Sequence, residues 1–322
     1  MTNKIQRLRT ITQEQGIIGG LQAIKRFFRY RLKSSISLIS SNPILRWKFE
    51  RQYGRGLDVM QEDWDNLIIL DACRYDTFEE HTRFEGKVQK VVSAGNYSWE
   101  FMIANFVGKE LHDTIYVTAN PYSARINESV FFKLISLIDE WDENTGTVLP
   151  EDVTQKAIEV SENHPDKRLI IHYMQPHAPH IGSIQDEFAQ MGFNKYHGMG
   201  VQSRTNEGIY IFNAVRQGLV TSERLHDSYV ENLRIAEGAV ESLVSKLNGK
   251  TVITADHGEN LGERVLGLRL YEHGNDTPEC LFVPWLELDY ESRREVIASE
   301  PVSDVRPGES TIDNRLRDLG YL

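Results

Sequence analysis

Cysteine is almost absent from this chain of 322 residues, which has only Cys73 and Cys280. Two such distant cysteines exclude the disulfide framework of a small secreted protein. No apolar run is long enough to span a bilayer, and the N-terminal stretch MTNKIQRLRTITQEQ lacks the apolar centre that a secretory signal needs. Internal repeats and low-complexity tracts are missing too. These absences predict a globular protein in a reducing, cytoplasmic location.

What the chain does contain is typical of a soluble globular protein. Hydrophobic residues make up 40% of the sequence and charged residues 26%. A chain of this length buries a substantial core in one large domain or two smaller ones. The net charge of −11 hides an asymmetry: residues 1–55 hold 12 Lys and Arg against two Glu, a balance of +10, which leaves −21 for the remainder. We therefore expect a basic N-terminal arm over residues 1–57 and an acidic main domain over residues 58–322.

Within the arm, residues 17–39 combine apolar and cationic side chains at helical spacing. The apolar set is Leu21, Ile24, Phe27, Phe28 and Leu32, and the cations are Lys25, Arg26, Arg29, Arg31 and Lys33. This pattern is typical of a helix that lies in a membrane interface. A helix that packs on the acidic main domain would explain it equally well. Nucleic acid is disfavoured as a partner because the acidic remainder would repel a phosphate backbone.

From residue 66 onwards, compact apolar runs alternate with helical patterns. The runs cover 66–72, 114–120, 168–174, 251–257 and 280–288, and the helical patterns include 127–141 and 221–249. This alternation predicts an α/β fold with a mostly parallel sheet that is covered by helices on both faces. Residues 181–220 are rich in Gly, Gln and Asn, so we expect a loop insertion there, over the functional site.

Polar side chains follow several of the predicted strands. In TVITADHGENLGE (251–263), Asp256 and His257 come directly after a buried run. A carboxylate and an imidazole suit Zn²⁺, Mn²⁺ or a similar divalent ion, although a charged turn would look the same. Further oxygen and imidazole donors lie in other segments, namely Asp71 and Asp76, His177 and His180, and His273. Ligands bind at the carboxyl ends of strands in open α/β sheets, so convergence on one site is the better interpretation.

The order of these motifs resembles the alkaline-phosphatase/sulfatase superfamily. The motifs are D-x-x-R-x-D at 71–76, H-x-P at 177–179, D-H-G-E-x-x-G-E at 256–263, H-G at 273–274 and LRDLGYL at 316–322. The nearest groups are the sulfatases and the phosphoglycerol transferases related to lipoteichoic acid synthase. The resemblance implies a three-layer α/β/α sandwich that is alkaline-phosphatase-like and binds a divalent metal at the strand ends.

The resemblance also implies roles for individual residues. Those that resemble the family's metal ligands are Asp71, Asp256 and His257. His177 resembles the histidine that contacts the transferred or leaving group. His273 resembles a histidine that holds anionic oxygens of the substrate or a second metal. Arg74 is expected to brace the site by pairing with Asp76 or Glu259 rather than to touch substrate.

The family also needs a nucleophile some thirty residues after the first Asp, at a helix N-terminus where the dipole and the metal lower its pKa. In SAGNYSWEFMIANF (93–106), Ser98 fits best because it would open the apolar helix. Ser93 is the competitor. The remaining alternative is that Ser98 is an ordinary N-cap.

Two departures from the sulfatase pattern favour phosphoryl chemistry. Sulfatases of the common kind oxidise a cysteine in C-x-P-x-R to formylglycine, and neither Cys73 nor Cys280 has this context. They also carry two adjacent acids where this chain has Asp71 and Ala72. Because this chain has fewer acidic residues at the expected metal site, one Mn²⁺-, Zn²⁺- or Mg²⁺-like ion is favoured over Ca²⁺.

We therefore expect a metal-dependent hydrolase or transferase that acts on phosphate esters, or on sulfate esters, through a serine nucleophile. The basic arm suggests a lipid-linked or surface-glycan substrate and peripheral contact with the anionic inner face of the membrane. The alternatives are a sulfatase that works without formylglycine, a non-catalytic glycan- or lipid-binding member of the superfamily, and an inert domain that the arm tethers to nucleic acid.

Overall fold

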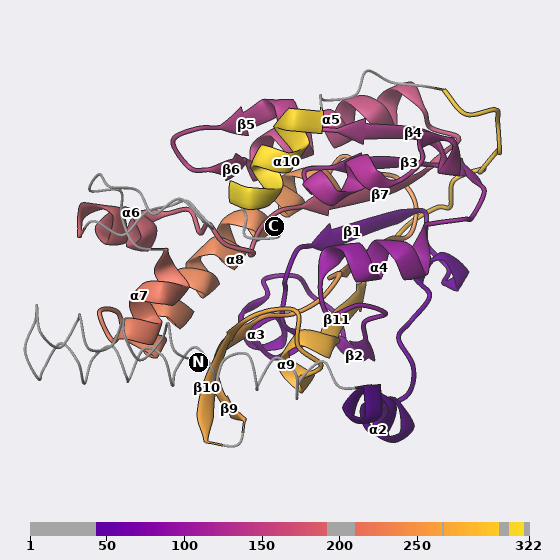
Figure 1. The fold of residues 1–322 in the computed structure, drawn as a ribbon. Coiled ribbons are helices and arrows are strands. Elements are labelled where there is room, and N and C mark those ends of the chain that lie inside the picture. The colour runs from indigo at the N-terminus through magenta and orange to yellow at the C-terminus, as the bar shows by residue number, and fades with distance from the viewer. Residues whose placement is uncertain (1–42, 192–209, 266, 303–308, 319–322) are drawn as a thin grey trace, which may run out of the picture. The chain divides into compact units, whose positions relative to one another are not determined.

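A seven-stranded sheet forms the centre of the computed structural model, which describes residues 43–191, 210–265, 267–302 and 309–318 (Figure 1). The strand order is β2-β11-β8-β1-β7-β3-β4. The strands are β1 (Asn66–Leu70), β2 (Gln89–Val92), β3 (Leu111–Thr118), β4 (Phe131–Ser136), β7 (Arg168–Tyr173), β8 (Thr251–Thr254) and β11 (Phe282–Glu287). The five strands from β8 to β4 are parallel, and β11 runs antiparallel to both β8 and β2.

The central strands are buried on both faces, as their unbroken apolar sequences require. In β1, Leu67, Ile68, Ile69 and Leu70 are completely buried. Odd and even positions point to opposite faces, so each strand contributes to two separate apolar clusters. The parallel register aligns Ile69 of β1 with His172 of β7, which brings the ends of these strands to one edge of the sheet.

Helices cover both faces of the sheet (Figure 1). On one face lie α3 (Tyr75–His81), α5 (Pro150–Asn163) and α8 (Ser222–Val244), which share an apolar cluster with the strands. The other face carries α4 (Ser98–Asn105), the 3₁₀ turn η2 (Pro121–Arg125) and α10 (Glu309–Asp318). The sequence-based prediction of a three-layer α/β/α sandwich is therefore confirmed.

Smaller elements complete the fold. Two pairs of short strands form hairpins, β5 (Trp141–Asp142) with β6 (Thr147–Val148) and β9 (Asn260–Val265) with β10 (Leu268–Glu272). Further short elements are the 3₁₀ turns η1 (Val59–Gln61), η3 (Glu128–Val130) and η4 (Ile138–Glu140) and the one-turn helix α9 (Pro278–Leu281). No helix in the described part of the chain is both long enough and apolar enough to cross a membrane.

The chain divides into two compact units. The larger runs from Tyr53 to Gly274 and resumes at Pro278, and it contains the whole sheet. The smaller contains the described residues up to Gln52, most of α2 (Pro43–Tyr53), with Asn275–Thr277. In it Arg46 pairs with Glu50 at 3.1 Å and with Asp276 at 2.8 Å. The basic segment 17–39 lies outside the described residues.

The helix predicted over 127–141 is wrong. Residues Phe131–Ser136 form strand β4, which pairs in parallel with β3, and 3₁₀ turns flank it on both sides. Asn127 caps the short turn η3, where its side chain accepts from Ser129 N. Strand pairing prevailed over helical spacing here because Phe131, Leu134 and Ile135 reach the buried clusters from an edge strand.

The described part of 181–220 is helical rather than a loop. Helix α6 covers Ser183–Gln190 and α7 covers Ile211–Gln217, and residues 192–209 between them lie outside the described residues. Both helices bury aromatic residues, Phe188 and Phe212, in a third apolar cluster that also contains Tyr229 of α8. Because residues 181–220 are rich in Gly and Asn, the short apolar faces of α6 and α7 were not recognised in the sequence.

Candidate functional site

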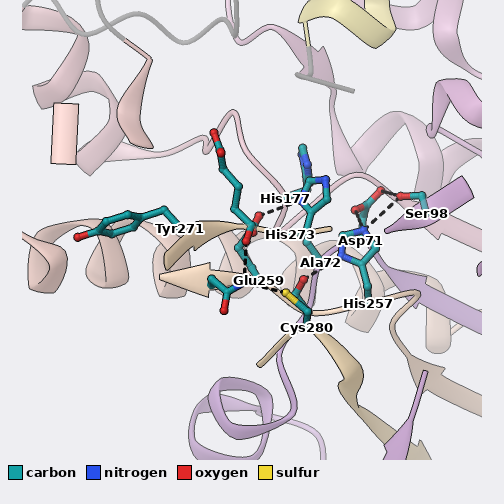
Figure 2. Close-up of polar contacts among 12 residues, drawn as sticks. Asp71, Ala72, Ser98, His177, His257, Glu259, Tyr271, His273 and Cys280 are labelled. Atoms are coloured by element: carbon teal, nitrogen blue, oxygen red, sulfur yellow. Dashed lines mark hydrogen bonds and ion pairs between the residues drawn. The ribbon is translucent and has the colours of Figure 1, made fainter. Parts of the chain in front are cut away.

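The candidate site lies at the carboxyl ends of the parallel strands, where four neighbouring strands deliver polar residues. Asp71 follows β1, Asp256 and His257 follow β8, and Asn120 follows β3. His172 is the penultimate residue of β7. Parallel strands end at the same edge of a sheet, so these side chains converge although they are far apart in sequence. Figure 2 shows Asp71 and His257 beside Ser98.

The first ligand group consists of Asp71, Asp256 and His257, whose ligand atoms all lie within 4.8 Å of one another. His257 Nε2 lies 3.4 Å from Asp71 Oδ1 and 3.5 Å from Asp256 Oδ2. All three side chains are completely buried. The structure thus brings together the three residues that the sequence singled out as metal ligands.

The backbone around this group fixes which atoms face inward. Asp256 Oδ1 accepts from the amides of His257 (2.9 Å) and Ala72 (3.1 Å). Its Oδ2 is buried and has no hydrogen-bond partner among the described residues. His257 Nδ1 lies 2.8 Å from the carbonyl of Gly258, which keeps the imidazole proton on Nδ1. The Nε2 lone pair therefore points towards the two carboxylates. A carboxylate oxygen without a partner and an imidazole lone pair directed to the same place are what a divalent cation requires.

The electrostatics of the group point the same way. Burial raises the pKa of Asp71 well above its usual value, and the nearby Asp256 carboxylate raises it further. Burial also lowers the pKa of His257 to about 4, so this imidazole is neutral at physiological pH. The raised pKa of Asp71 indicates that the metal-free site lacks the positive charge needed to balance a second buried carboxylate. Asp71, Asp256 and His257 therefore fit a dication.

Ser98 is the first residue of α4, and its hydroxyl sits against the same group. Ser98 Oγ donates to Asp71 Oδ2 at 3.3 Å and lies 3.3 Å from His257 Nε2. Tyr97 occupies the N-cap position, so Ser98 is not the cap of this helix. Ser93 is engaged differently: its Oγ donates to the carbonyl of Asp256 and accepts from the amide of Gly95 at 3.1 Å. The two candidate serines thus have distinct surroundings.

A second ligand group lies next to the first and contains His177, Glu259 and His273, again within 4.8 Å (Figure 2). His273 Nδ1 lies 3.3 Å from Glu259 Oε2. The ring of His273 is 5.0 Å from that of His177 and 4.6 Å from that of His257, measured between centroids. Burial raises the pKa of Glu259. Burial lowers the pKa of His273, but the Glu259 carboxylate, with the charges of Glu272 and Asp256, more than offsets this, so the pKa of His273 is raised.

Glu259 was missed as a ligand candidate. From its sequence context Glu259 is expected only to pair with Arg74, although it stands in the D-H-G-E block two residues after His257. The turn at Gly258 brings its carboxylate back beside His273, and the amide of Gly258 bonds to the carbonyl of Cys280 at 2.8 Å. The position of Glu259 inside D-H-G-E, the most specific of the motifs, could have identified it as a ligand candidate.

Other predicted contacts differ in detail. His180 does not join either group, because its Nδ1 lies 2.9 Å from Ser228 Oγ on α8 and burial lowers its pKa to about 3. Arg74 braces the site as expected: it bonds Asp76 through Nε (2.8 Å) and Nη2 (2.6 Å). It reaches Glu259 through the backbone carbonyl (3.2 Å), and its further partner is the carboxylate of Glu263.

Two residues of the site were not predicted at all. Asn120 Nδ2 donates to Asp71 Oδ2 at 2.6 Å, while its Oδ1 accepts from the amide of Tyr122. His172 is completely buried, with its Nε2 close to both Asp71 and Asp256. Asn120 is the last residue of the predicted strand 114–120, and this position at a strand end could have identified it as a site residue. His172 stood inside an apolar run, where a histidine is usually a core residue.

A sequence model of the sulfatase family matches residues 84–305. The chain belongs to the sulfatase family. This confirms the resemblance inferred from the motifs. The match includes every residue of the two ligand groups except Asp71, which precedes it, and it also includes Ser98. No curated protein is similar enough to the sequence to count as a relative.

Several solved structures resemble this member of the sulfatase family. The zinc complex of the C-terminal periplasmic domain of EptC from Escherichia coli is 13% identical, with a TM-score of 0.46, over 73% of this chain and 75% of that chain. The integral membrane protein lipooligosaccharide phosphoethanolamine transferase A from Neisseria meningitidis is 14% identical, with a TM-score of 0.44, over 90% and 59%. An alkaline phosphatase superfamily protein from Vibrio parahaemolyticus is 14% identical, with a TM-score of 0.40, over 81% and 67%.

Proposed function

We propose that this protein is a metal-dependent enzyme that hydrolyses or transfers phosphate esters through Ser98. Membership of the sulfatase family supports an enzyme. The observation that carries the proposal is the position of Ser98 Oγ, 3.3 Å from both Asp71 and His257 at the start of a helix. A hydroxyl held between ligand candidates, on a helix N-terminus that favours negative charge, is arranged as a nucleophile.

The first ligand group would hold one divalent cation, with Ser98 as a further ligand. When bound, such a cation polarises an ester oxygen and favours ionisation of the serine hydroxyl. Mn²⁺, Zn²⁺ or Mg²⁺ suits two carboxylates and an imidazole better than Ca²⁺, which takes six to eight oxygen ligands. Ala72, where many sulfatases have a second acid, leaves no carboxylate to complete a calcium site.

Four side chains have roles in the proposed displacement at phosphorus. Ser98 Oγ attacks phosphorus in line, and the Oγ–P bond forms as the bond to the leaving oxygen breaks. The hydroxyl proton leaves towards Asp71 Oδ2, which already accepts it in a hydrogen bond. His177 lies beside the equatorial oxygens, and His273, whose pKa the neighbouring acids raise, gives its proton to the leaving oxygen. Water in a hydrolase reaction, or an acceptor hydroxyl in a transferase reaction, then attacks phosphorus and the Oγ–P bond breaks. The proton of the attacking oxygen returns to His273, and Asp71 returns the hydroxyl proton to Ser98.

Sulfate esters are the second candidate substrates, because the matching family is named for sulfatases. Phosphate is preferred because a serine, not a cysteine, occupies the position beside the ligand group. A lipid-linked or surface-glycan ester is the proposed natural substrate, based on the basic arm at residues 1–57. With it we propose a cytoplasmic enzyme that is peripheral on the inner face of the membrane.

The test combines metal analysis with a panel of aryl phosphate monoesters, phosphate diesters and sulfate esters. We expect a divalent metal in the purified protein and turnover of a phosphate ester. Ser98→Ala should lower kcat by roughly a thousandfold or more. Ser93→Ala is the matched control and should keep most of the activity. Mass spectrometry should find a phosphoryl group on Ser98 in the trapped wild type.

The possible results separate the candidates. Turnover of sulfate esters alone would favour the second candidate. Unchanged turnover in Ser98→Ala would exclude a serine nucleophile at this position. A metal-loaded protein that turns over no ester and instead binds glycan or lipid would favour the non-catalytic alternative.

A further inference from the structure

His172 is a buried histidine that the proposed chemistry does not use. It lies on β7 and has no exposed surface. Its Nε2 lies 3.7 Å from Asp71 Oδ2 and 3.6 Å from Asp256 Oδ2, almost midway between the two carboxylates. These separations are about half an ångström beyond an ordinary hydrogen bond. Within the described part of the chain, Nε2 has no hydrogen-bond partner.

The other side of the imidazole is held by Tyr116 of β3. The Tyr116 hydroxyl lies 2.8 Å from His172 Nδ1, and the two rings are stacked with centroids 6.2 Å apart. Burial raises the pKa of Tyr116, so the phenol keeps its proton. The imidazole is therefore held from behind by the Tyr116 hydroxyl.

These surroundings determine where the imidazole proton sits. Carboxylate oxygens only accept hydrogen bonds. At His257 the Gly258 carbonyl holds the proton on Nδ1, so a lone pair faces the carboxylates there. The Tyr116 hydroxyl beside His172 Nδ1 can instead donate, which lets His172 turn an N–H towards them. A proton on Nε2 turns the same contact into a favourable one. Nδ1 is then the acceptor, and the Tyr116 hydroxyl is the donor that suits it.

We infer that His172 is a positioning residue, which directs its Nε2–H at Asp71 Oδ2 and Asp256 Oδ2 and is held in that tautomer by Tyr116. It holds two like-charged carboxylates at a fixed separation and orients them as ligands. Outer partners of this kind typically contribute a factor of 10–100 to metal affinity. The consequence for metal binding rests on the proposed function, whereas the tautomer does not.

Calorimetric titration of the full-length, metal-free protein with Zn²⁺ tests the positioning role. His172→Leu removes the donor and should weaken Zn²⁺ binding about 10–100-fold. His172→Gln restores an N–H near the place of Nε2 and should recover much of that loss. Tyr116→Phe frees the imidazole and should weaken binding by a smaller factor. Because Tyr116 acts only through His172, the double variant His172→Leu/Tyr116→Phe should bind no more weakly than His172→Leu.

Tyr173→Phe is the matched control. Tyr173 follows His172 on β7, so it points to the opposite face, where its hydroxyl bonds to Thr154 Oγ1 at 2.8 Å. It is as buried as Tyr116, so its loss should reduce thermal stability without changing Zn²⁺ affinity. Unchanged Zn²⁺ affinity in His172→Leu overturns the inference. So do additive losses in the double variant, or a His172→Gln variant as weak as His172→Leu.

The tautomer is measured separately by ¹⁵N NMR of the histidine-labelled, metal-free protein, with the His172 signal assigned by its absence in His172→Gln. We expect the proton on Nε2 in the wild type and exchange between tautomers in Tyr116→Phe. A proton on Nδ1 in the wild type overturns the inference. If the wild type does not bind Zn²⁺, the proposed function fails, and the NMR result still decides the tautomer.

Discussion

At the scale of single residues, the cost of a buried carboxylate depends on what surrounds it. Asp65 is as buried as Asp71, yet it accepts from Arg293 Nε at 2.6 Å and from the Lys250 amide at 2.7 Å. Asp71 instead shares its pocket with a second acid, Asp256. The first arrangement stabilises the fold. The second opposes it until a cation binds, which is the usual compromise at a functional site.

This contrast predicts opposite effects for the same chemical change. Asp71→Asn should raise the stability of the metal-free protein by about 1 kcal/mol, because it removes one of two like charges. Asp65→Asn should lower stability by about 2 kcal/mol, because it weakens a charged hydrogen-bond network. Thermal unfolding in the presence of a chelator measures both. Adding Zn²⁺ should stabilise the wild type and Asp65→Asn but not Asp71→Asn. Destabilisation of the metal-free protein by Asp71→Asn would contradict this account.

At the scale of elements, strand ends carried most of the predictive information. Short buried runs located β1 and β8, and therefore the neighbouring positions of Asp71, Asp256 and His257. Strand order was not predictable from the same runs, so the approach of β3 to the site was not predicted, and Asn120 was missed with it. His177 marked the end of β7, but His172 was missed because it stands inside the apolar run of that strand. Tertiary pairing decided these placements and also converted a helical pattern into β4.

The Arg74 contacts show how elements are locked around the site. Arg74 leads into α3 and joins it to the β9–β10 hairpin, through Glu263 and the carbonyl of Glu259. Its amide also donates to the Tyr229 hydroxyl of α8 at 3.0 Å, and that hydroxyl donates to the carbonyl of Ala72 at 2.6 Å. Ala72 has a φ of 59°, so this brace holds an unfavourable backbone conformation directly after Asp71.

We therefore predict that Arg74→Met destabilises the protein by about 2 kcal/mol, since it removes several charged hydrogen bonds at a side chain that is only 8% exposed. Arg224→Met is the control, because Arg224 pairs with Glu187 but is 39% exposed, and surface pairs contribute about 1 kcal/mol or less. Chemical denaturation of both variants measures the difference. Equal losses of unfolding free energy in the two variants would show that the burial of the Arg74 contacts does not increase their contribution to stability.

At the scale of the whole molecule, charge is divided unevenly along the chain. Residues 1–55 carry +10 and the remainder carries −21. An anionic membrane surface attracts the first part and repels the second, which would orient the enzyme with its basic arm towards the lipid. A substrate that is itself attached to lipid would then be concentrated at the same surface. The acidic remainder offers a competing partner for the same cations.

Sedimentation with anionic phospholipid vesicles distinguishes these two partners. Each cation near such a surface contributes about 1 kcal/mol, so the variant Lys25→Gln, Arg26→Gln, Arg29→Gln, Arg31→Gln, Lys33→Gln should lose most vesicle binding. The wild type should bind at low salt and release at high salt, because salt screens charges beyond a Debye length of roughly 8 Å at physiological ionic strength. Lys87→Gln with Lys246→Gln removes exposed cations from the main domain and should leave binding unchanged. If the wild type stays in the supernatant at low salt while the five-site variant unfolds at a lower temperature, the arm packs on the acidic domain instead.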